Sequence, residues 1–266
     1  MIIAGGITVD AKTFPDNTLF VKLDPYSEQF QWEDDIAIQW FYENDSELFT
    51  LICIKKHLDH FFDCNTHINL YMPYMPHARM DRVKNAEEVF TLKYFCETIN
   101  SLKFDTVFVL DVHSNVSLAL LDNVVEMKPF KAIERAMKNI DNPVLFYPDE
   151  GAMKRYSKDI VSPYAFGIKD RDWKTGQIKG LTLINTDAVK DQNVLIVDDI
   201  CSRGGTFLHS AKALKAAGAK SISLYVTHCE NTILEGEVFT CGLIDNVYTS
   251  NTLVHCDELA NKVKYV

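Results

Sequence analysis

The sequence predicts an α/β fold of mainly parallel sheets flanked by helices. Short apolar runs alternate along the chain with longer segments of helical periodicity. The clearest run, VLIV at 194–197, is followed by a helical segment and then by another apolar run at 221–226. Strand–helix–strand units of this length are typical of parallel strands covered by helices.

The individual elements follow from the spacing of apolar residues. Apolar runs predict strands at 51–54, 68–72, 106–110, 144–147, 194–197 and 221–226. Apolar residues on one face predict helices at 87–102 and 206–217. Gly218 is the expected C-cap of the second helix, because glycine readily adopts the left-handed conformation that ends helices.

Composition limits the class of protein. The 266 residues carry a net charge of −10, with 27 Lys and Arg against 37 Asp and Glu. An acidic surface argues against nucleic-acid binding, which needs neutralisation of phosphates. The seven cysteines contain no CxxC pair, which favours reduced thiols and a cytoplasmic location. Neither a signal peptide nor an apolar stretch of about 18 residues is found, so no membrane association is expected.

An internal echo predicts two related halves. DTVFVLDVH at 105–113 and QNVLIVDDI at 192–200 each run from an apolar strand into an aspartate. A Pro-containing loop with basic residues precedes each of them. The expected α/β domains are 1–140 and 141–266, packed closely with the site between them.

The most informative stretch is VLIVDDICSRGGT at 194–206. Its strand delivers two adjacent carboxylates at the carboxyl end, where ligands bind in open α/β sheets. The glycines let backbone N–H groups approach an anion, and the following helix N-terminus adds a favourable dipole. A ribose diol and its phosphate suit this arrangement; an ordinary turn with Asp and Gly is the alternative. The expected ribose-phosphate-binding residues are Asp198, Asp199, Ser202, Arg203, Gly204, Gly205 and Thr206.

This string resembles the phosphoribosyl-diphosphate (PRPP) binding loop of type I phosphoribosyltransferases and of ribose-phosphate diphosphokinases, the PRPP synthetases. Other segments resemble those of the synthetases in the same order, over roughly residues 45–255. They are PHARMDR at 76–82, LDVHS at 110–114, PDEGAMKR at 148–155, KDR at 169–171, TH at 227–228 and SNT at 250–252. An ordinary phosphoribosyltransferase has only the second half of this set. The chain is therefore identified as a short, divergent relative of the synthetases, with a phosphoribosyltransferase-like fold in each half.

The resemblance implies a Mg²⁺-dependent transferase that moves the β,γ-diphosphate of ATP to the anomeric hydroxyl of ribose 5-phosphate, giving PRPP and AMP. It also implies a homo-oligomer. The implied ATP-binding residues are Arg79, Asp81, Arg82 and His113, the implied catalytic residues are Lys169 and Arg171, and the implied metal ligands are His113 and Asp149. Lys169 and Arg171 adjoin a polar stretch at 172–180, for which an ordinary surface loop is the alternative reading.

Several departures from the family pattern keep alternatives open. Ser202-Arg203 stands where the family usually has Asp-Thr, which makes the loop more positive. The extra guanidinium could favour a larger 5-substituent, so ADP-ribose, in NAD salvage, is an alternative acceptor. A catalytically silent regulatory homologue and a phosphoribosyltransferase acting on a base are further alternatives. The first 45 residues match poorly, and the only adenine-site candidates there are Asp24, Tyr26 and Glu28.

Overall fold

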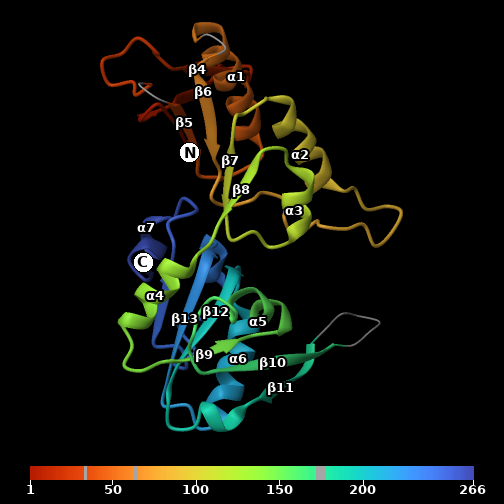
Figure 1. The fold of residues 1–266 in the computed structure, drawn as a ribbon, viewed down its shortest axis with the longest axis vertical. Coiled ribbons are helices and arrows are strands. Elements are labelled where there is room, and N and C mark those ends of the chain that lie inside the picture. The colour runs from red at the N-terminus through yellow and green to blue at the C-terminus, as the bar shows by residue number, and fades with distance from the viewer. Residues whose placement is uncertain (33–34, 63–64, 172–177) are drawn as a thin grey trace. The chain divides into compact units, whose positions relative to one another are not determined.

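The chain forms two compact units, Met1–Lys128 and Pro129–Val266, each with its own sheet (Figure 1). This computed structural model describes residues 1–32, 35–62, 65–171 and 178–266, and only the backbone of 169–171 and 178–181. Both units have mainly parallel strands flanked by helices, so the predicted α/β class is confirmed. The second unit includes α4 (Phe130–Lys138), while the domain limits read from the sequence stay a prediction.

The sheet of the first unit has the strand order β2-β1-β5-β6-β7-β8. Strands β5 to β8 are parallel, and β1 pairs antiparallel with β2 and β5. A separate hairpin consists of β3 and β4. The bounds are β1 Ile2–Ala4, β2 Ile7–Thr8, β3 Asp10–Thr13, β4 Leu19–Lys22, β5 Asp35–Trp40, β6 His67–Tyr71, β7 Val107–Leu110, β8 Val124–Met127, α1 Ser46–Phe61, α2 Thr91–Ser101 and α3 Asn115–Leu120.

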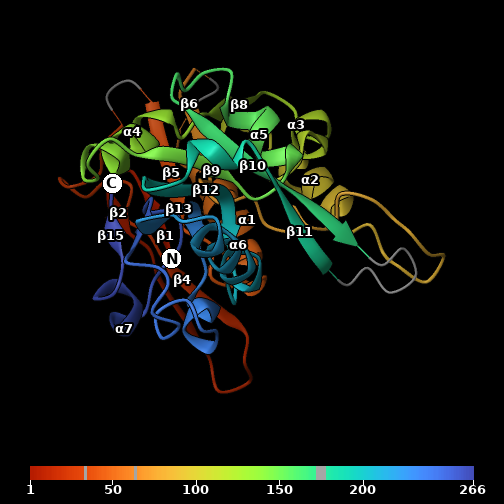
Figure 2. The ribbon, with the colours of Figure 1, turned by 90° about the horizontal axis from the view of Figure 1, so that it is seen from below.

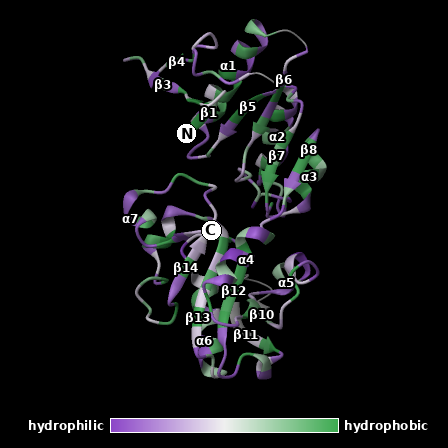
Figure 3. Ribbon diagram, turned by 60° about the vertical axis from the view of Figure 1, so that its left-hand side comes forward, coloured by the Kyte–Doolittle hydropathy of each residue, from purple (hydrophilic) through white to green (hydrophobic). Residues whose placement is uncertain are grey.

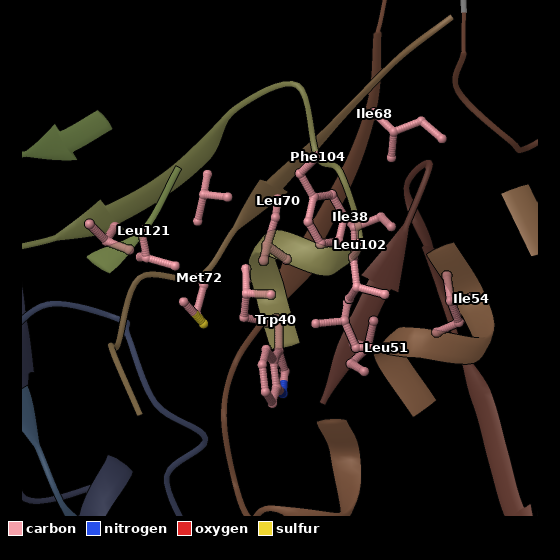
Figure 4. Packing of buried hydrophobic residues seen from close by; sticks show 14 of the residues in the cluster. Ile38, Trp40, Leu51, Ile54, Ile68, Leu70, Met72, Leu102, Phe104 and Leu121 are labelled. Atoms are coloured by element: carbon pink, nitrogen blue, oxygen red, sulfur yellow. The ribbon is translucent and has the colours of Figure 1, made fainter. Parts of the chain in front are cut away.

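The core of the first unit is formed by strand residues packed with residues of α1 and α2. Figure 4 shows Trp40 of β5 near Leu51 of α1, with Ile54 one turn further along the helix. The predicted strand at 51–54 is therefore wrong. Leu51, Ile54 and Leu58 are buried at spacings of three and four, so the apolar run is the inner face of a helix.

The sheet of the second unit has the order β11-β10-β9-β12-β13-β14-β15, in which only the β10–β11 pair is antiparallel among the described strands. Figure 2 shows α4 and α5 on one side of β9, β12 and β13, and α6 on the other. The bounds are β9 Val144–Tyr147, β10 Tyr164–Arg171, β11 Ile178–Ile184, β12 Asn193–Cys201, β13 Ser221–Cys229, β14 Asn246–Thr249, β15 Lys264–Tyr265, α5 Glu150–Tyr156, α6 Gly205–Ala216, α7 Asp257–Ala260 and the 3-10 turns η1 Thr186–Ala188 and η2 Asn231–Glu235.

Strand β12 is apolar on both faces because helices cover both sides of it. Val194 and Ile196 belong to the cluster covered by α6, whereas Leu195 and Val197 belong to the cluster covered by α4 and α5. Side chains alternate between the two faces of a strand, so a strand covered twice reads as a continuous apolar run. Figure 3 shows this hydrophobic stretch in green along β12, and a similar one along β7.

Most predicted elements of the second unit are confirmed with shifted ends. Strand β9 has the predicted bounds, while β12 and β13 continue three or four residues beyond the predicted 197 and 226, to 201 and 229. Gly218 ends α6 with φ +91°, as expected of a C-cap glycine. In the first unit, the helix predicted at 87–102 begins only at Thr91.

Candidate active site

The loop between β12 and α6 has the geometry of an anion site. Gly204 adopts φ +77°, and α6 begins at Gly205 without a side-chain cap. A Cβ at Gly204 would lie 2.1 Å from Val238 Cγ2, whereas one at Gly205 would meet nothing within 4 Å. The first N–H groups of a helix have no acceptor within the helix, so open space at Gly205 leaves room for an anion to accept from them.

Asp198 and Asp199 lie within β12, three and two residues before its last residue. The Asp199 N–H donates to Asp198 Oδ1 at 3.0 Å, and the Ile200 N–H donates to Asp199 Oδ1 at 2.8 Å. Burial raises the pKa of Asp198 well above its usual value, and the carboxylates of Asp199 and Asp149 raise it further. A cation or a hydrogen-bond donor from a ligand would relieve this concentration of negative charge.

Arg155 of α5 forms an ion pair with Asp199. Its Nη1 donates to Asp199 Oδ2 at 2.9 Å, and the Asp199 side chain is 7% exposed. Arg155 lies in the segment PDEGAMKR at 148–155, but no role is expected for it from the sequence. Alternation along β12 places Asp199 on the face that α5 covers, which is the signal that could have suggested this pair.

Asp149, a predicted metal ligand, caps α5 by accepting from the Ala152 N–H at 3.0 Å. Its carboxylate is close enough to Asp198 to raise the pKa of that residue, and carboxylate oxygens are ligands that Mg²⁺ prefers, so Asp149 suits the ion chemically. Within the described ranges, no group of three or more His, Cys, Asp or Glu side chains is arranged to hold a metal. His113 belongs to the first unit, and its pairing with Asp149 stays a prediction.

The two downstream landmarks of the sequence lie together at the carboxyl ends of β13 and β14. His228 Nδ1 is 2.9 Å from Thr252 Oγ1, and Thr252 Oγ1 donates to the Thr227 carbonyl oxygen at 3.2 Å. His228 is paired in register with Ile200 of β12. This buried polar network fixes the strand ends beside the loop.

The predicted ATP-binding segments follow two neighbouring parallel strands of the first unit. Strand β6 ends at Tyr71, β7 ends at Leu110, and the two strands pair with each other. The Leu110 N–H donates to the Pro73 carbonyl oxygen at 3.1 Å, so both segments leave the same edge of the sheet. Arg79 and His113 are exposed beyond this edge.

Asp81 and Arg82 contact each other. Arg82 Nε donates to Asp81 Oδ1 at 3.0 Å, with the side chains 72% and 16% exposed for Arg82 and Asp81. Asp81 therefore supports the Arg82 guanidinium, which stays accessible to a ligand. Their predicted roles toward ATP stay predictions.

His77 holds the turn that precedes Arg79. Its φ of +60° is uncommon for a residue with a side chain. The His77 Nε2–H donates to Asp45 Oδ1 at 3.0 Å, and its ring centroid lies 5.2 Å from that of Phe95. No role is expected for His77 from the sequence, because an unusual φ stabilised by contacts with distant residues leaves no local pattern.

The predicted catalytic residues Lys169 and Arg171 lie on β10, paired in register with Leu181 and Ile178 of β11. Their side chains and residues 172–177 of the adjoining polar stretch lie outside the described part of the chain. Their catalytic roles therefore stay predictions.

Two cavities of the first unit contain the adenine-site candidates. Tyr26 and Glu28 line a cavity of about 1240 Å³, and Asp24 lines another of about 620 Å³. Aromatic side chains dominate the larger cavity, which also includes Asp35 and Thr66 at the amino ends of β5 and β6. It therefore lies at the end of the sheet opposite to Arg79 and His113. The aromatic residues lining it are Tyr26, Phe30, Trp32, Phe61 and Phe62.

The fold is phosphoribosyltransferase-like. A family model described as "Phosphoribosyl transferase domain" matches residues 152–239, which contain β12, the loop and α6. The crystal structure of phosphoribosylpyrophosphate synthetase from Mycobacterium smegmatis matches with a TM-score of 0.76 and 18% identity, over 97% of this chain and 85% of that chain. This likeness shows a shared fold.

Sequence relatives point to one family among such proteins. The ribose-phosphate pyrophosphokinase of Saccharolobus solfataricus is 27% identical, over 84% of this chain and 76% of the relative. That of Sulfolobus acidocaldarius is 25% identical, over 99% of this chain and 94% of the relative. Together with the shared fold, these findings support a divergent member of the PRPP synthetase family, and the resemblance seen in the sequence is confirmed. Among the described residues, no helix has the length and apolar character needed to cross a membrane.

Proposed function

We propose that the protein is a diphosphokinase that uses ATP to pyrophosphorylate ribose 5-phosphate. The anomeric hydroxyl oxygen forms a bond to the β-phosphorus, the bond between that phosphorus and the α,β-bridging oxygen breaks, and the hydroxyl proton is released. The products are PRPP and AMP. The observation that carries this proposal is the β12–α6 loop, where two carboxylates adjoin a helix N-terminus with open space in front of it.

Each group of residues has a distinct part in the proposal. Asp198 and Asp199 accept hydrogen bonds from the ribose hydroxyls, and the loop from Ser202 to Thr206 binds the 5-phosphate. Arg79 and Arg82 bind the triphosphate of ATP with charge-assisted hydrogen bonds. Lys169 and Arg171 stabilise charge on the diphosphate during transfer, a reaction type in which positioning and charge neutralisation dominate.

Magnesium is the proposed cofactor. Asp149 and His113 would hold it, with waters completing its coordination. When bound, the ion neutralises charge on the phosphate oxygens. The raised pKa of Asp198 supports a cation nearby, because positive charge would stabilise the carboxylate that the site now disfavours.

The adenine site is proposed to involve a second copy of the chain. The aromatic cavity with Tyr26 and Glu28 offers rings for stacking a base. It lies at the end of the sheet opposite to Arg79. The cavity of one copy would therefore bind the adenine of an ATP molecule whose phosphates are bound by another copy. This arrangement would require a homo-oligomer. The seven widely spaced cysteines, which contain no CxxC pair, favour a cytoplasmic location.

ADP-ribose is a second candidate acceptor, favoured by Arg203 in the loop. A third possibility is a catalytically silent homologue, and a fourth is a phosphoribosyltransferase acting on a base without ATP. The test is incubation with ATP, Mg²⁺ and each acceptor separately, with AMP measured by chromatography. AMP with ribose 5-phosphate supports the proposal. AMP formation with ADP-ribose but not with ribose 5-phosphate would show that ADP-ribose is the acceptor. No AMP formation with either compound would refute diphosphokinase activity.

A further inference from the structure

A segment that follows β13 runs along the ribose-phosphate loop. The Glu230 N–H donates to the Cys201 carbonyl oxygen at 2.8 Å. Ser202 Oγ and Thr232 Oγ1 are 2.9 Å apart and share a hydrogen bond. Two successive residues, Cys201 and Ser202, are thus held by Glu230 and Thr232 of this segment, which we call the bracket and define as residues 230–238.

The backbones of the loop and the bracket are in close contact. A Cβ at Gly236 would lie 1.9 Å from the Arg203 carbonyl oxygen, so only glycine fits there without movement. A Cβ at Gly204 would likewise lie 2.1 Å from the Cγ2 of Val238. The bracket therefore fixes the position of the loop backbone independently of any ligand.

Arg203 forms an ion pair with Glu235 of the bracket. Arg203 Nε and Nη2 donate to Glu235 Oε2 at 2.9 Å and 2.6 Å. The side chains are 71% and 54% exposed, and an exposed ion pair is weak enough to exchange with a competing anion. Among the residues that the structure describes, the Arg203 guanidinium makes no other hydrogen bond or ion pair.

We propose that the Arg203–Glu235 pair selects the acceptor by the charge of its 5-substituent, an inference that rests on the proposed function. A single phosphate at the start of α6 is served by backbone N–H groups and by the hydroxyls of Ser202 and Thr206. Glu235 then keeps Arg203 neutralised. A second phosphate brings further anionic oxygens, which displace the carboxylate and take the guanidinium in a charge-assisted contact.

Glu235 therefore acts as a specificity-determining residue. A ligand must carry enough anionic charge to displace the Glu235 carboxylate before it can bind the Arg203 guanidinium. Removing the charge of Glu235 while keeping the shape of its side chain should strengthen binding of a ribose that carries a diphosphate at its 5-position. Binding of a ribose monophosphate should change little.

The experiment compares Glu235→Gln with wild type by calorimetric titration of ribose 5-phosphate and of ADP-ribose. We expect ADP-ribose to bind about three- to fivefold more tightly to the variant, and ribose 5-phosphate to change less than about twofold, as fits the loss of one exposed counter-charge. Combining Glu235→Gln with Arg203→Gln should remove the gain. Glu237→Gln is the matched control, since Glu237 is an exposed acid of the same bracket.

The inference would be overturned if Glu235→Gln changed the affinities for both ligands equally or not at all. It would also be overturned if the gain in ADP-ribose affinity persisted in the double variant that lacks Arg203. If wild type binds neither ribose ligand, the proposed function fails. Titration with inorganic phosphate and with pyrophosphate then tests the inference separately, because the proposed exchange at the Arg203–Glu235 pair depends only on the charge of the ligand. A preference for pyrophosphate that rises in Glu235→Gln supports it, and an unchanged preference overturns it.

Discussion

Arg155 and Asp199 form a largely buried ion pair, with Arg155 Nη1 2.9 Å from Asp199 Oδ2. This contact sets the orientation of one of the two carboxylates beside the β12–α6 loop. The contact also gives Asp198 and Asp199 different electrostatic environments. Asp199 has a fixed positive partner, whereas the raised pKa of Asp198 reflects burial beside two further carboxylates.

Replacing Arg155 by alanine should weaken acceptor binding and the fold together. The change leaves a buried carboxylate without its charged partner, which costs about 1–3 kcal/mol of unfolding free energy. Chemical denaturation and titration with ribose 5-phosphate measure the two effects. Lys154→Ala is the control, because Lys154 forms an exposed pair with Glu150 and should lose much less stability. Equal losses in the two variants would contradict a special role for Arg155.

Asp198→Asn should stabilise the protein at neutral and alkaline pH while impairing acceptor binding. A carboxyl group whose folded pKa is raised contributes stability below that pKa and loses it as the pH rises through it. Asparagine stays neutral, so the gain over wild type should grow between pH 5 and pH 8. A gain on the order of 1 kcal/mol raises Tm by roughly 2–4 °C in a chain of this size.

Thermal denaturation at both pH values checks this prediction. Asp187→Asn serves as the control, since Asp187 is exposed on η1 and should show no such pH-dependent gain. A Tm difference for Asp198→Asn that is the same at pH 5 and pH 8 would argue against a raised pKa in the folded protein.

The two glycines of the loop should respond differently to alanine. Gly204→Ala should destabilise the fold by about 1–3 kcal/mol, because φ is +77° and the new Cβ would meet Val238. Gly205→Ala should change stability by less than about 0.5 kcal/mol, since open space surrounds that position.

Ligand binding provides the complementary measurement for these glycines. If the 5-phosphate lies at the start of α6, the Gly205→Ala methyl group should weaken ribose 5-phosphate binding despite the intact fold. Normal binding by a stable Gly205→Ala variant would place the phosphate elsewhere.

Lys169→Ala and Arg171→Ala should abolish AMP formation while leaving ATP binding largely intact. Loss of one group that stabilises transition-state charge lowers the rate by about 10²–10³-fold or more. Single-turnover AMP release and equilibrium ATP binding separate the two effects. Lys190→Ala, an exposed lysine outside the proposed site, is the control. Full activity in both variants would refute the catalytic assignment.

The sequence by itself determined the α/β class, the β12–loop–α6 unit and the two aspartates that it carries. These features depend on local patterns. A strand buried on both faces must be apolar throughout, and a residue with φ near +77° favours glycine. The same local reading was wrong for α1, because an apolar run of four residues fits a buried strand and the inner face of a helix equally well.

Only the tertiary structure decided which side chains support the loop. Arg155 and Asp199 are 44 residues apart in sequence, and Arg203 and Glu235 are 32 apart. Nothing in the local pattern of either member specifies its partner, since these contacts arise when separate helices, turns and strands pack. The charge of the loop shows the consequence. The sequence indicates an unopposed Arg203, whereas packing against the bracket places the carboxylate of Glu235 on its guanidinium.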